Sequence, residues 1–439
     1  MISRSFPPLY PIPVGVVDRF SSFAIASGVL VNMAVLAGVV WVLATTFKRF
    51  ESILSFAPFF ASVLVLALTP SLTNDVAGAR VLPLTFLLVL YATYVAVERD
   101  APVLLGTTLG LAALARFDTT AFAILLPILL VLLGKQTLRS SAKTYFAMML
   151  VYATWGVRNW LLFGSFFASD NAISALSLTP GMAQLNWYIE TPARAWNAVH
   201  EWSTQRVSYL VENVRVLVNG TQLFGGLLPL LALAALPFAS GLAREKTRWY
   251  GAVVLLFVVT NLASVSLTSF HDARYFAISA VLTFIAFTQW ACEAISDRRT
   301  SRVFVEKWTC VSETGLLMAC ASCLILVFFF RTSYVADQYE EGANLKQLRE
   351  LIAPIIPPGS RVATGVGYAE SMSYYMGYMT VSMPSGQSST PAFYDWQRHW
   401  RMDFSIVSPT SPTASEWNNA VRASLNGWRV IDLRLAQTK

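Results

Sequence analysis

A succession of apolar segments runs from residue 23 to residue 330 and limits the folds open to this chain. A helix of about 20 apolar residues crosses the hydrocarbon core of a bilayer. About ten segments approach that length, near residues 23–46, 54–70, 80–97, 102–116, 119–134, 143–163, 222–241, 249–268, 274–291 and 313–330. The sequence therefore predicts an all-α polytopic membrane region with about ten transmembrane helices over residues 23–330.

The composition agrees with this prediction. Hydrophobic residues make up 55% of the chain and charged residues 13%, whereas a soluble domain carries about 25% charged residues. A disordered chain and a disulfide-stapled secreted domain are excluded. The net charge of +7 does not indicate nucleic acid, because the basic excess lies in the apolar region and no long charged stretch is present. We expect membrane lipids as partners and no nucleic acid.

Two neighbouring segments, 102–116 and 119–134, are short for membrane spans. Either each helix is tilted in the membrane, or the two helices meet at a re-entrant bend around Arg116 and Asp118. The sequence alone leaves both arrangements open.

Basic residues in alternate loops indicate how the predicted helices are oriented. Loops that are rich in Lys and Arg face the cytoplasm. All five lysines before residue 331 lie in one set of alternate loops, whereas the nine basic residues of the other set are all arginines. We therefore expect a multi-pass integral protein of the plasma (inner) membrane, with residues 1–22, the loop 164–221 and the region 331–439 outside the cytoplasm.

The predicted outer loop 164–221 contains apolar residues at helical spacing, including Val207, Leu210, Val211 and Val214. This spacing is typical of an amphipathic helix that lies on the outer membrane surface. A helix packed within the loop would show the same pattern, so both interpretations stay open.

Residues 331–439 have the composition of a soluble domain. Strands are predicted near residues 361–367, 378–383, 404–407 and 429–433, and helices near 345–352, 368–376, 393–400 and 416–425. Alternation of strands and helices predicts a small α/β domain with a largely parallel sheet.

Ionisable side chains gather at the predicted outer ends of the helices, where they are costly and tend to be functional. An arginine holds a phosphate with a planar pair of donors. A carboxylate removes a proton from an acceptor or holds a divalent metal. The set suits an anionic, lipid-linked substrate and consists of Asp75, Arg80, Arg116, Asp118, Arg158, His271, Asp272 and Arg274.

Each of these residues also has a plainer interpretation, as an anchor at the membrane interface or as one member of a neutralised ion pair. Asp118 in particular is close enough in sequence to pair with Arg116. His271 belongs to no zinc-binding motif. The sequence contains no hydrolase elbow, P-loop or zinc-protease motif.

Four segments along the chain resemble motifs of one family. They are Phe6-Pro-Pro-Leu-Tyr-Pro11, Gly110-Leu-Ala-Ala-Leu-Ala-Arg-Phe-Asp118 followed by Leu125-Leu-Pro127, Trp155-Gly-Val-Arg-Asn-Trp-Leu-Leu-Phe-Gly-Ser165, and Asp272-Ala-Arg-Tyr275. In this order they resemble motifs of the C-type (GT-C) membrane glycosyltransferases. The similar branch contains the dolichyl-phosphate-mannose–protein mannosyltransferases and the aminoarabinose transferase of lipid A.

This resemblance implies that a sugar moves from a polyprenyl-phosphate donor to a lipid, glycan or protein acceptor on the outer membrane face. In the family, an acidic residue of the first outer loop acts as base or metal ligand, and basic residues bind the donor phosphate. The candidate catalytic acid here is Asp75. The candidate phosphate-binding residues are Arg274, Arg80, Arg116 and Arg158, and the candidate substrate-cavity residues are Tyr10, His271, Asp272 and Tyr275. The resemblance fixes no cofactor and leaves a divalent metal open.

The start of the chain departs from the family pattern. In relatives, a first helix and a loop with an acidic residue come before the Pro-Pro-Leu-Tyr segment, whereas only five residues precede Phe6 here and none is acidic. Residues 1–22 are therefore interpreted as the remnant of a first outer loop. We expect that the chain is shortened at its N-terminus; the alternatives are an inactive protein, or one in which Asp75 carries the role alone.

The main hypothesis from the sequence is thus a membrane glycosyltransferase that uses a polyprenyl-phosphate sugar. A transporter or flippase for a lipid-linked or anionic solute is the alternative, and a non-catalytic scaffold is the third. A transporter more often shows repeated halves and charges near the middle of the membrane. The charges here lie toward one predicted face, which favours the enzyme.

Overall fold

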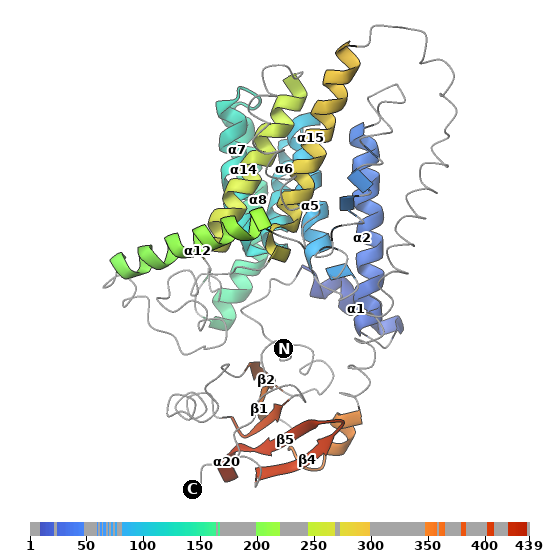
Figure 1. Ribbon diagram of the computed structural model, residues 1–439, viewed down its shortest axis with the longest axis vertical. Helices are drawn as coiled ribbons and strands as arrows, with labels where there is room; N and C mark the ends of the chain where they lie inside the picture. The colour runs from blue at the N-terminus through green and yellow to red at the C-terminus, as the bar shows by residue number, and fades with distance from the viewer. Residues whose placement is uncertain are drawn as a thin grey trace. The chain divides into compact units, whose positions relative to one another are not determined.

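The computed structural model of the chain (Figure 1) divides it into two compact units. One consists of residues 4–169 and 203–335, and the other of residues 1–3, 170–202 and 336–439. The structure describes residues 9–21, 24–47, 59, 62–63, 65–66, 69, 72, 75–76, 81–163, 166, 199–219, 245–267, 273–298, 347–357, 360–364, 379–382, 402–407 and 420–436.

The described part of the first unit is a helix bundle. Two short 3-10 turns, η1 (Phe117–Thr119) and η2 (Ala273–Phe276), interrupt it. Its helices are α1 (Pro11–Ser21), α2 (Ala24–Phe47), α5 (Leu82–Glu98), α6 (Pro102–Ala115), α7 (Thr120–Leu132), α8 (Leu138–Phe163), α12 (Val199–Asn219), α14 (Glu245–Leu267) and α15 (Ala277–Arg298). Figure 1 shows α5, α6, α7, α8, α14 and α15 side by side, with α2 next to α5.

The bounds of most of these helices lie within a few residues of the apolar segments predicted from the sequence. Two of the described helices, Ser27–Phe47 and Thr247–Leu267, are long and apolar enough to cross a membrane. The helices Leu82–Glu98, Pro102–Ala115, Phe117–Leu132 and Ala277–Gln289 are apolar but shorter. The segments predicted near 222–241 and 313–330, and most of 54–70, lie outside the described residues.

Within the expected remnant of a first outer loop, residues 11–21 form the helix α1. Proline is well placed at the first position of a helix, since its missing N–H would have no partner there, and Pro11 begins α1. The helix packs against α2, where Tyr10 contacts Val31 and Val35.

The close contact between α6 and α8 depends on two glycines that face α8. A Cβ atom on Gly106 would meet the carbonyl oxygen of Thr144, and one on Gly110 would lie 2.8 Å from the Cβ of Val151. Glycines four residues apart form a flat surface on a helix, which lets two backbones approach closely. This glycine pair was not among the features predicted from the sequence.

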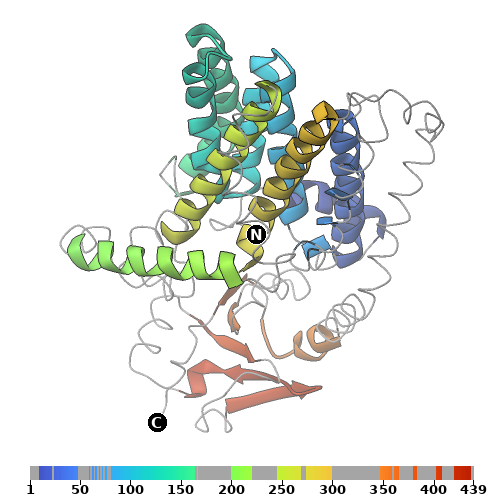
Figure 2. The same ribbon diagram turned by 45° about the horizontal axis from the view of Figure 1, so that its top comes forward.

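Helix α12 falls within the predicted outer loop and lies across α14 rather than along it (Figures 1 and 2). Two polar residues of α12 face the bundle: Arg206 and Asn213 are buried, and the Asn213 amide donates to the Ser266 hydroxyl of α14 at 3.0 Å. Its apolar residues Val207 and Val211 are 59% and 47% exposed. The face of α12 that contacts the bundle therefore includes Arg206, Asn213 and the partly buried Val216, whereas Val207 and Val211 face outward.

The second unit contains a five-stranded sheet in the order β2-β1-β3-β5-β4. The strands are β1 (Arg361–Thr364), β2 (Met379–Ser382), β3 (Phe404–Val407), β4 (Val421–Leu425) and β5 (Trp428–Asp432), and a short helix α20 (Leu433–Ala436) follows β5. Strand β1 pairs in parallel with β2 and β3, whereas β5 pairs antiparallel with both β3 and β4. The expected largely parallel sheet is therefore wrong: the sheet is mixed.

Residues 416–425 were predicted to be helical, and this prediction is wrong for 421–425, which form β4. The reason is the turn that follows. Asn426 and Gly427 have positive φ values of 50° and 82° and connect β4 to β5 as a hairpin. Asn-Gly is the sequence that this kind of two-residue turn favours. The helix predicted near 345–352 is present over 347–352, and those near 368–376 and 393–400 lie outside the described residues.

An ion pair at the end of β5 makes the sheet unit sensitive to pH. The Asp432 carboxylate accepts hydrogen bonds from Nε and Nη2 of Arg434, each at 3.0 Å. These bonds hold the pKa of Asp432 below its ordinary value. Since the pKa is lower in the folded state, the bonds stabilise the fold above the unfolded-state pKa of about 4 and are lost as pH falls below it.

We expect that lowering the pH from about 7 to about 3 speeds hydrogen exchange in β3 and β5 more in the wild-type protein than in Asp432→Asn, which has no carboxylate to protonate. The measurement is hydrogen exchange by mass spectrometry, corrected for the intrinsic pH dependence of exchange. Glu350→Gln removes an exposed carboxylate of the same unit and is the control. Equal pH dependence in all three proteins would contradict a stabilising role of the Asp432 bonds.

Candidate functional site

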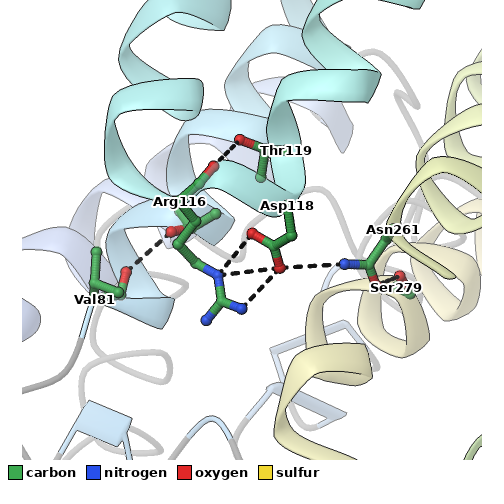
Figure 3. Close-up of polar contacts among 7 residues, drawn as sticks. Val81, Arg116, Asp118, Thr119, Asn261 and Ser279 are labelled. Carbon is green, nitrogen blue, oxygen red and sulfur yellow. Dashed lines mark hydrogen bonds and ion pairs between the residues drawn. The ribbon is translucent and has the colours of Figure 1, made fainter. Parts of the chain in front are cut away.

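The bend between α6 and α7 carries the first part of the site. Arg116 ends α6 in an extended conformation, with φ −150° and ψ 134°, and Asp118 lies in η1 directly after it. The guanidinium of Arg116 donates from Nε to Oδ1 of Asp118 at 3.0 Å and from Nη2 to Oδ2 at 2.7 Å (Figure 3). Each side chain is only 14% exposed. The two predicted segments thus meet at Arg116 and Asp118, and these residues form a partly buried ion pair.

Helices α14 and α15 supply the second part of the site. The Asn261 amide of α14 donates to Oδ2 of Asp118 at 3.4 Å, and the Ser279 hydroxyl of α15 donates to Oδ1 of Asn261 at 2.9 Å (Figure 3). The ring of Tyr275, in η2, lies 4.9 Å from Cζ of Arg116 in a cation–π contact. We call Arg116, Asp118, Asn261, Tyr275 and Ser279 the Arg116 cluster.

Asp75, the candidate acid, lies near this cluster. It is 4% exposed, and its backbone carbonyl accepts a hydrogen bond from the Asn32 amide of α2 at 3.2 Å. Its carboxylate is close enough to the Tyr10 hydroxyl and the Arg116 guanidinium to contribute to the electrostatics of each, although burial dominates at Tyr10 and burial with the Asp118 carboxylate dominates at Arg116. The fold therefore brings Asp75 and Arg116, which are far apart in the sequence, within electrostatic reach of each other.

Tyr10, a predicted substrate-cavity residue, makes contacts that join α1 to α2. Its hydroxyl donates to the carbonyl oxygen of Gly28 at 3.3 Å, and its side chain is 9% exposed. Burial raises the pKa of Tyr10 well above its ordinary value, so the hydroxyl stays protonated. Its role beside a substrate stays a prediction.

The other predicted residues are placed less fully. Arg158 contacts its own helix: its Cζ lies 4.2 Å from the ring centroid of Trp155, and Nη1 donates to Oδ1 of Asn159 at 3.0 Å. Arg274 lies in η2, directly before Tyr275, but its side chain is outside the described part. Arg80, His271 and Asp272 lie outside the described residues.

Metal chemistry finds little support in the described part of the chain. Among those residues, no group of three or more His, Cys, Asp or Glu side chains could hold a metal ion. Both Asp118 oxygens accept hydrogen bonds from Arg116. A divalent metal stays a prediction, and no step below uses one.

A second charged group marks the other end of the bundle. The Lys135 ammonium donates to the carbonyl oxygen of Val97 at 2.9 Å and lies 3.8 Å from the ring centroid of Trp249. Trp249 and Asn261 are both on α14, twelve residues apart, which corresponds to about 18 Å along a helix. The lysine and the Arg116 cluster therefore lie at different levels of the bundle.

Sequence reasoning missed Asn32, Asn261 and Ser279. All three are buried. Asn261 comes shortly after the apolar run 253–259 in α14, and an amide in such a helix is costly unless it is hydrogen-bonded. A search for single amides inside apolar segments would have found Asn32 and Asn261, whereas a lone serine gives no such signal.

No protein-family model matches the chain, and no curated protein matches it in sequence. The family resemblance of the four segments therefore stays a prediction.

Proposed function

We propose that this protein is a polytopic membrane glycosyltransferase. It moves a sugar from a polyprenyl-phosphate donor to a hydroxyl or amine of a lipid, glycan or protein acceptor on the outer face of the plasma (inner) membrane. The observation that carries the proposal is the Arg116–Asp118 ion pair, of which each side chain is only 14% exposed within an apolar helix bundle. Buried charges in an apolar helix bundle are costly and tend to be functional.

The proposed membrane arrangement has about ten spans, multi-pass topology and an extracytoplasmic C-terminal domain. The two long apolar helices and the four shorter ones support it. Lys135 belongs to the loops that the positive-inside rule places in the cytoplasm, and the Arg116 cluster lies at another level of α14, toward its C-terminal end. The exposed apolar side of α12 suits a helix on the outer membrane surface.

The proposed reaction divides the charges between two roles. Arginines, with Arg116 and Arg274 foremost and Arg80 and Arg158 as further candidates, hold the donor phosphate and stabilise the charge that develops as it leaves. Asp75 accepts the proton of the acceptor. The acceptor oxygen or nitrogen forms a bond to the anomeric carbon, the bond from that carbon to the phosphate oxygen breaks, and the polyprenyl phosphate leaves with the bonding electron pair.

The test uses full-length protein in lipid vesicles with a radiolabelled polyprenyl-phosphate sugar. We expect Asp75→Asn to lower transfer at least about a hundredfold, because the substituted amide cannot accept the proton. Arg274→Lys should lower it about tenfold, because lysine lacks the planar pair of donors. Asp100→Asn and Arg99→Lys alter the same residue types at exposed positions and are the controls.

Two outcomes would contradict the proposal. Unchanged transfer in both variants would remove Asp75 and Arg274 from the proposed site. Movement of the labelled lipid across the bilayer without any sugar transfer would favour a flippase.

A further inference from the structure

One nitrogen of the Arg116 guanidinium is left over after the ion pair has formed. Nε and Nη2 donate to Asp118. Figure 3 shows the third nitrogen, Nη1, pointing away from Asp118, and it makes no hydrogen bond or ion pair to any residue that the structure describes. A guanidinium carries donors on all three nitrogens. Nη1 therefore has donors to offer a further acceptor.

The direction of Nη1 is set by residues on other helices. The Asp118 carboxylate accepts hydrogen bonds from two of the three guanidinium nitrogens. It also accepts one from the Asn261 amide, and Asn261 in turn accepts one from the Ser279 hydroxyl. Asn261 and Ser279 are each only 2% exposed, so water does not compete freely for these bonds. The Tyr275 ring adds a cation–π contact to the guanidinium.

The polar side chains next to this chain of bonds behave differently. The Thr260 hydroxyl donates to the carbonyl oxygen of Leu256 at 2.8 Å, and the Thr283 hydroxyl donates to that of Ser279 at 2.7 Å. Both therefore bond within their own helix. Asn261 and Ser279 instead form hydrogen bonds that connect α15, α14 and the bend. Bonds between elements are not needed to form the helices themselves.

We propose that Asn261 and Ser279 are positioning residues: through Asp118 they orient Arg116 so that Nη1 is presented to the phosphate group of the substrate. This inference rests on the proposed function, and it assigns the phosphate recognition to a four-residue chain of hydrogen bonds. A charge-assisted bond from a fixed, desolvated donor is stronger than one from a mobile donor. Loss of Asn261 weakens phosphate binding although the amide itself touches no phosphate.

The test measures binding rather than transfer. Full-length protein in nanodiscs is titrated with a polyprenyl monophosphate and, in a separate arm, with inorganic phosphate. Binding of the lipid alone identifies a headgroup site, and binding of both identifies a general phosphate site; each supports the proposal. We expect Arg116→Lys to weaken polyprenyl-phosphate binding by about tenfold or more, and Asn261→Leu and Ser279→Ala by about tenfold and threefold. Thr260→Val and Thr283→Val are matched controls on the same helices and should bind as the wild type does.

A double-mutant cycle separates positioning from general loss of structure. If Asn261 acts through Arg116, then Asn261→Leu has no further effect on binding once Arg116 is lysine. Additive losses in the double variant, or wild-type binding by Asn261→Leu, would overturn the proposal. Thermal melting of each variant shows whether it is folded, and Asn261→Gln, which keeps an amide, provides a second variant if Asn261→Leu does not fold.

This experiment also distinguishes the two proposals. If the protein binds polyprenyl phosphate with the expected double-mutant cycle but transfers no sugar, the positioning role is supported and the proposed glycosyltransferase activity is contradicted. If the wild-type protein transfers sugar while the Asn261→Leu variant binds polyprenyl phosphate normally, the glycosyltransferase activity is supported and the positioning role is contradicted. Absence of phosphate binding in the wild type overturns the positioning role directly.

Discussion

Gly106→Val is expected to destabilise the helix bundle by about 3 kcal/mol, enough to lower its melting temperature by several degrees. A side chain at this position meets the backbone oxygen of Thr144, and backbone cannot move aside as the end of a flexible side chain can. The helices α6 and α8 must then separate and lose their close packing. The measurement is the free energy of unfolding from a detergent titration, together with thermal melting.

Gly15→Val is the matched control for this prediction. It makes the same chemical change in a helix, but within the described part of the chain no residue outside the local helix backbone lies within 4 Å of a Cβ on Gly15. Valine also has a better helix propensity than glycine, so this variant should be as stable as the wild type or slightly more stable. Equal losses in the two variants would show that the α6–α8 contact does not depend on the glycine.

Asp118→Leu is expected to cost about 3–5 kcal/mol, because it leaves the Arg116 guanidinium buried without its counter-charge. The double variant Arg116→Leu/Asp118→Leu removes both charges and should recover most of that loss, since a well-packed apolar pair in place of a buried ion pair is often neutral in stability. Unfolding titrations of the two variants measure the difference directly.

An exposed ion pair on α12 provides the control for Asp118. Glu212 and Arg215 are paired at 3.1 Å, with side chains 49% and 66% exposed. Such pairs contribute about 0–1 kcal/mol, so Glu212→Gln should change stability little. If the single and double variants at Asp118 were equally unstable, the penalty would lie in packing at the bend and not in the unpaired charge.

The helices of the first unit could be predicted because most of them follow a long apolar segment of the sequence. The stretches Ser27–Phe47 and Thr247–Leu267 are long and mostly apolar, and no turn signal interrupts them. The bend at Arg116 and Asp118 was one of two predicted arrangements, because two opposite charges interrupt an apolar run there. The association of Asn261 and Ser279 with this bend could not be predicted, since it depends on which helices are neighbours.

The errors in the C-terminal unit have a local cause. The residues before Asn426 show a mixture of apolar and polar side chains that fits a helix as well as a strand. In β4, Arg422 and Ser424 are exposed while Val421, Ala423 and Leu425 are partly buried, which is the alternation of a strand. The two-residue turn decides between the two interpretations, and giving weight to Asn-Gly would have predicted the hairpin and the antiparallel edge.

The contact of α6 with α8 has a mechanical consequence. Because α6 approaches backbone oxygens and only small parts of side chains of α8 at Gly106 and Gly110, little deformable material separates the two helices there, and we expect the pair to move as one rigid unit with Arg116 at its end. Asn261 belongs to a different element, α14. We do not expect α6 to flex against α8. A change in the distance between Arg116 and Asn261 would therefore come from sliding of α14 and α15 past the α6–α8 pair, or from a hinge motion in η1.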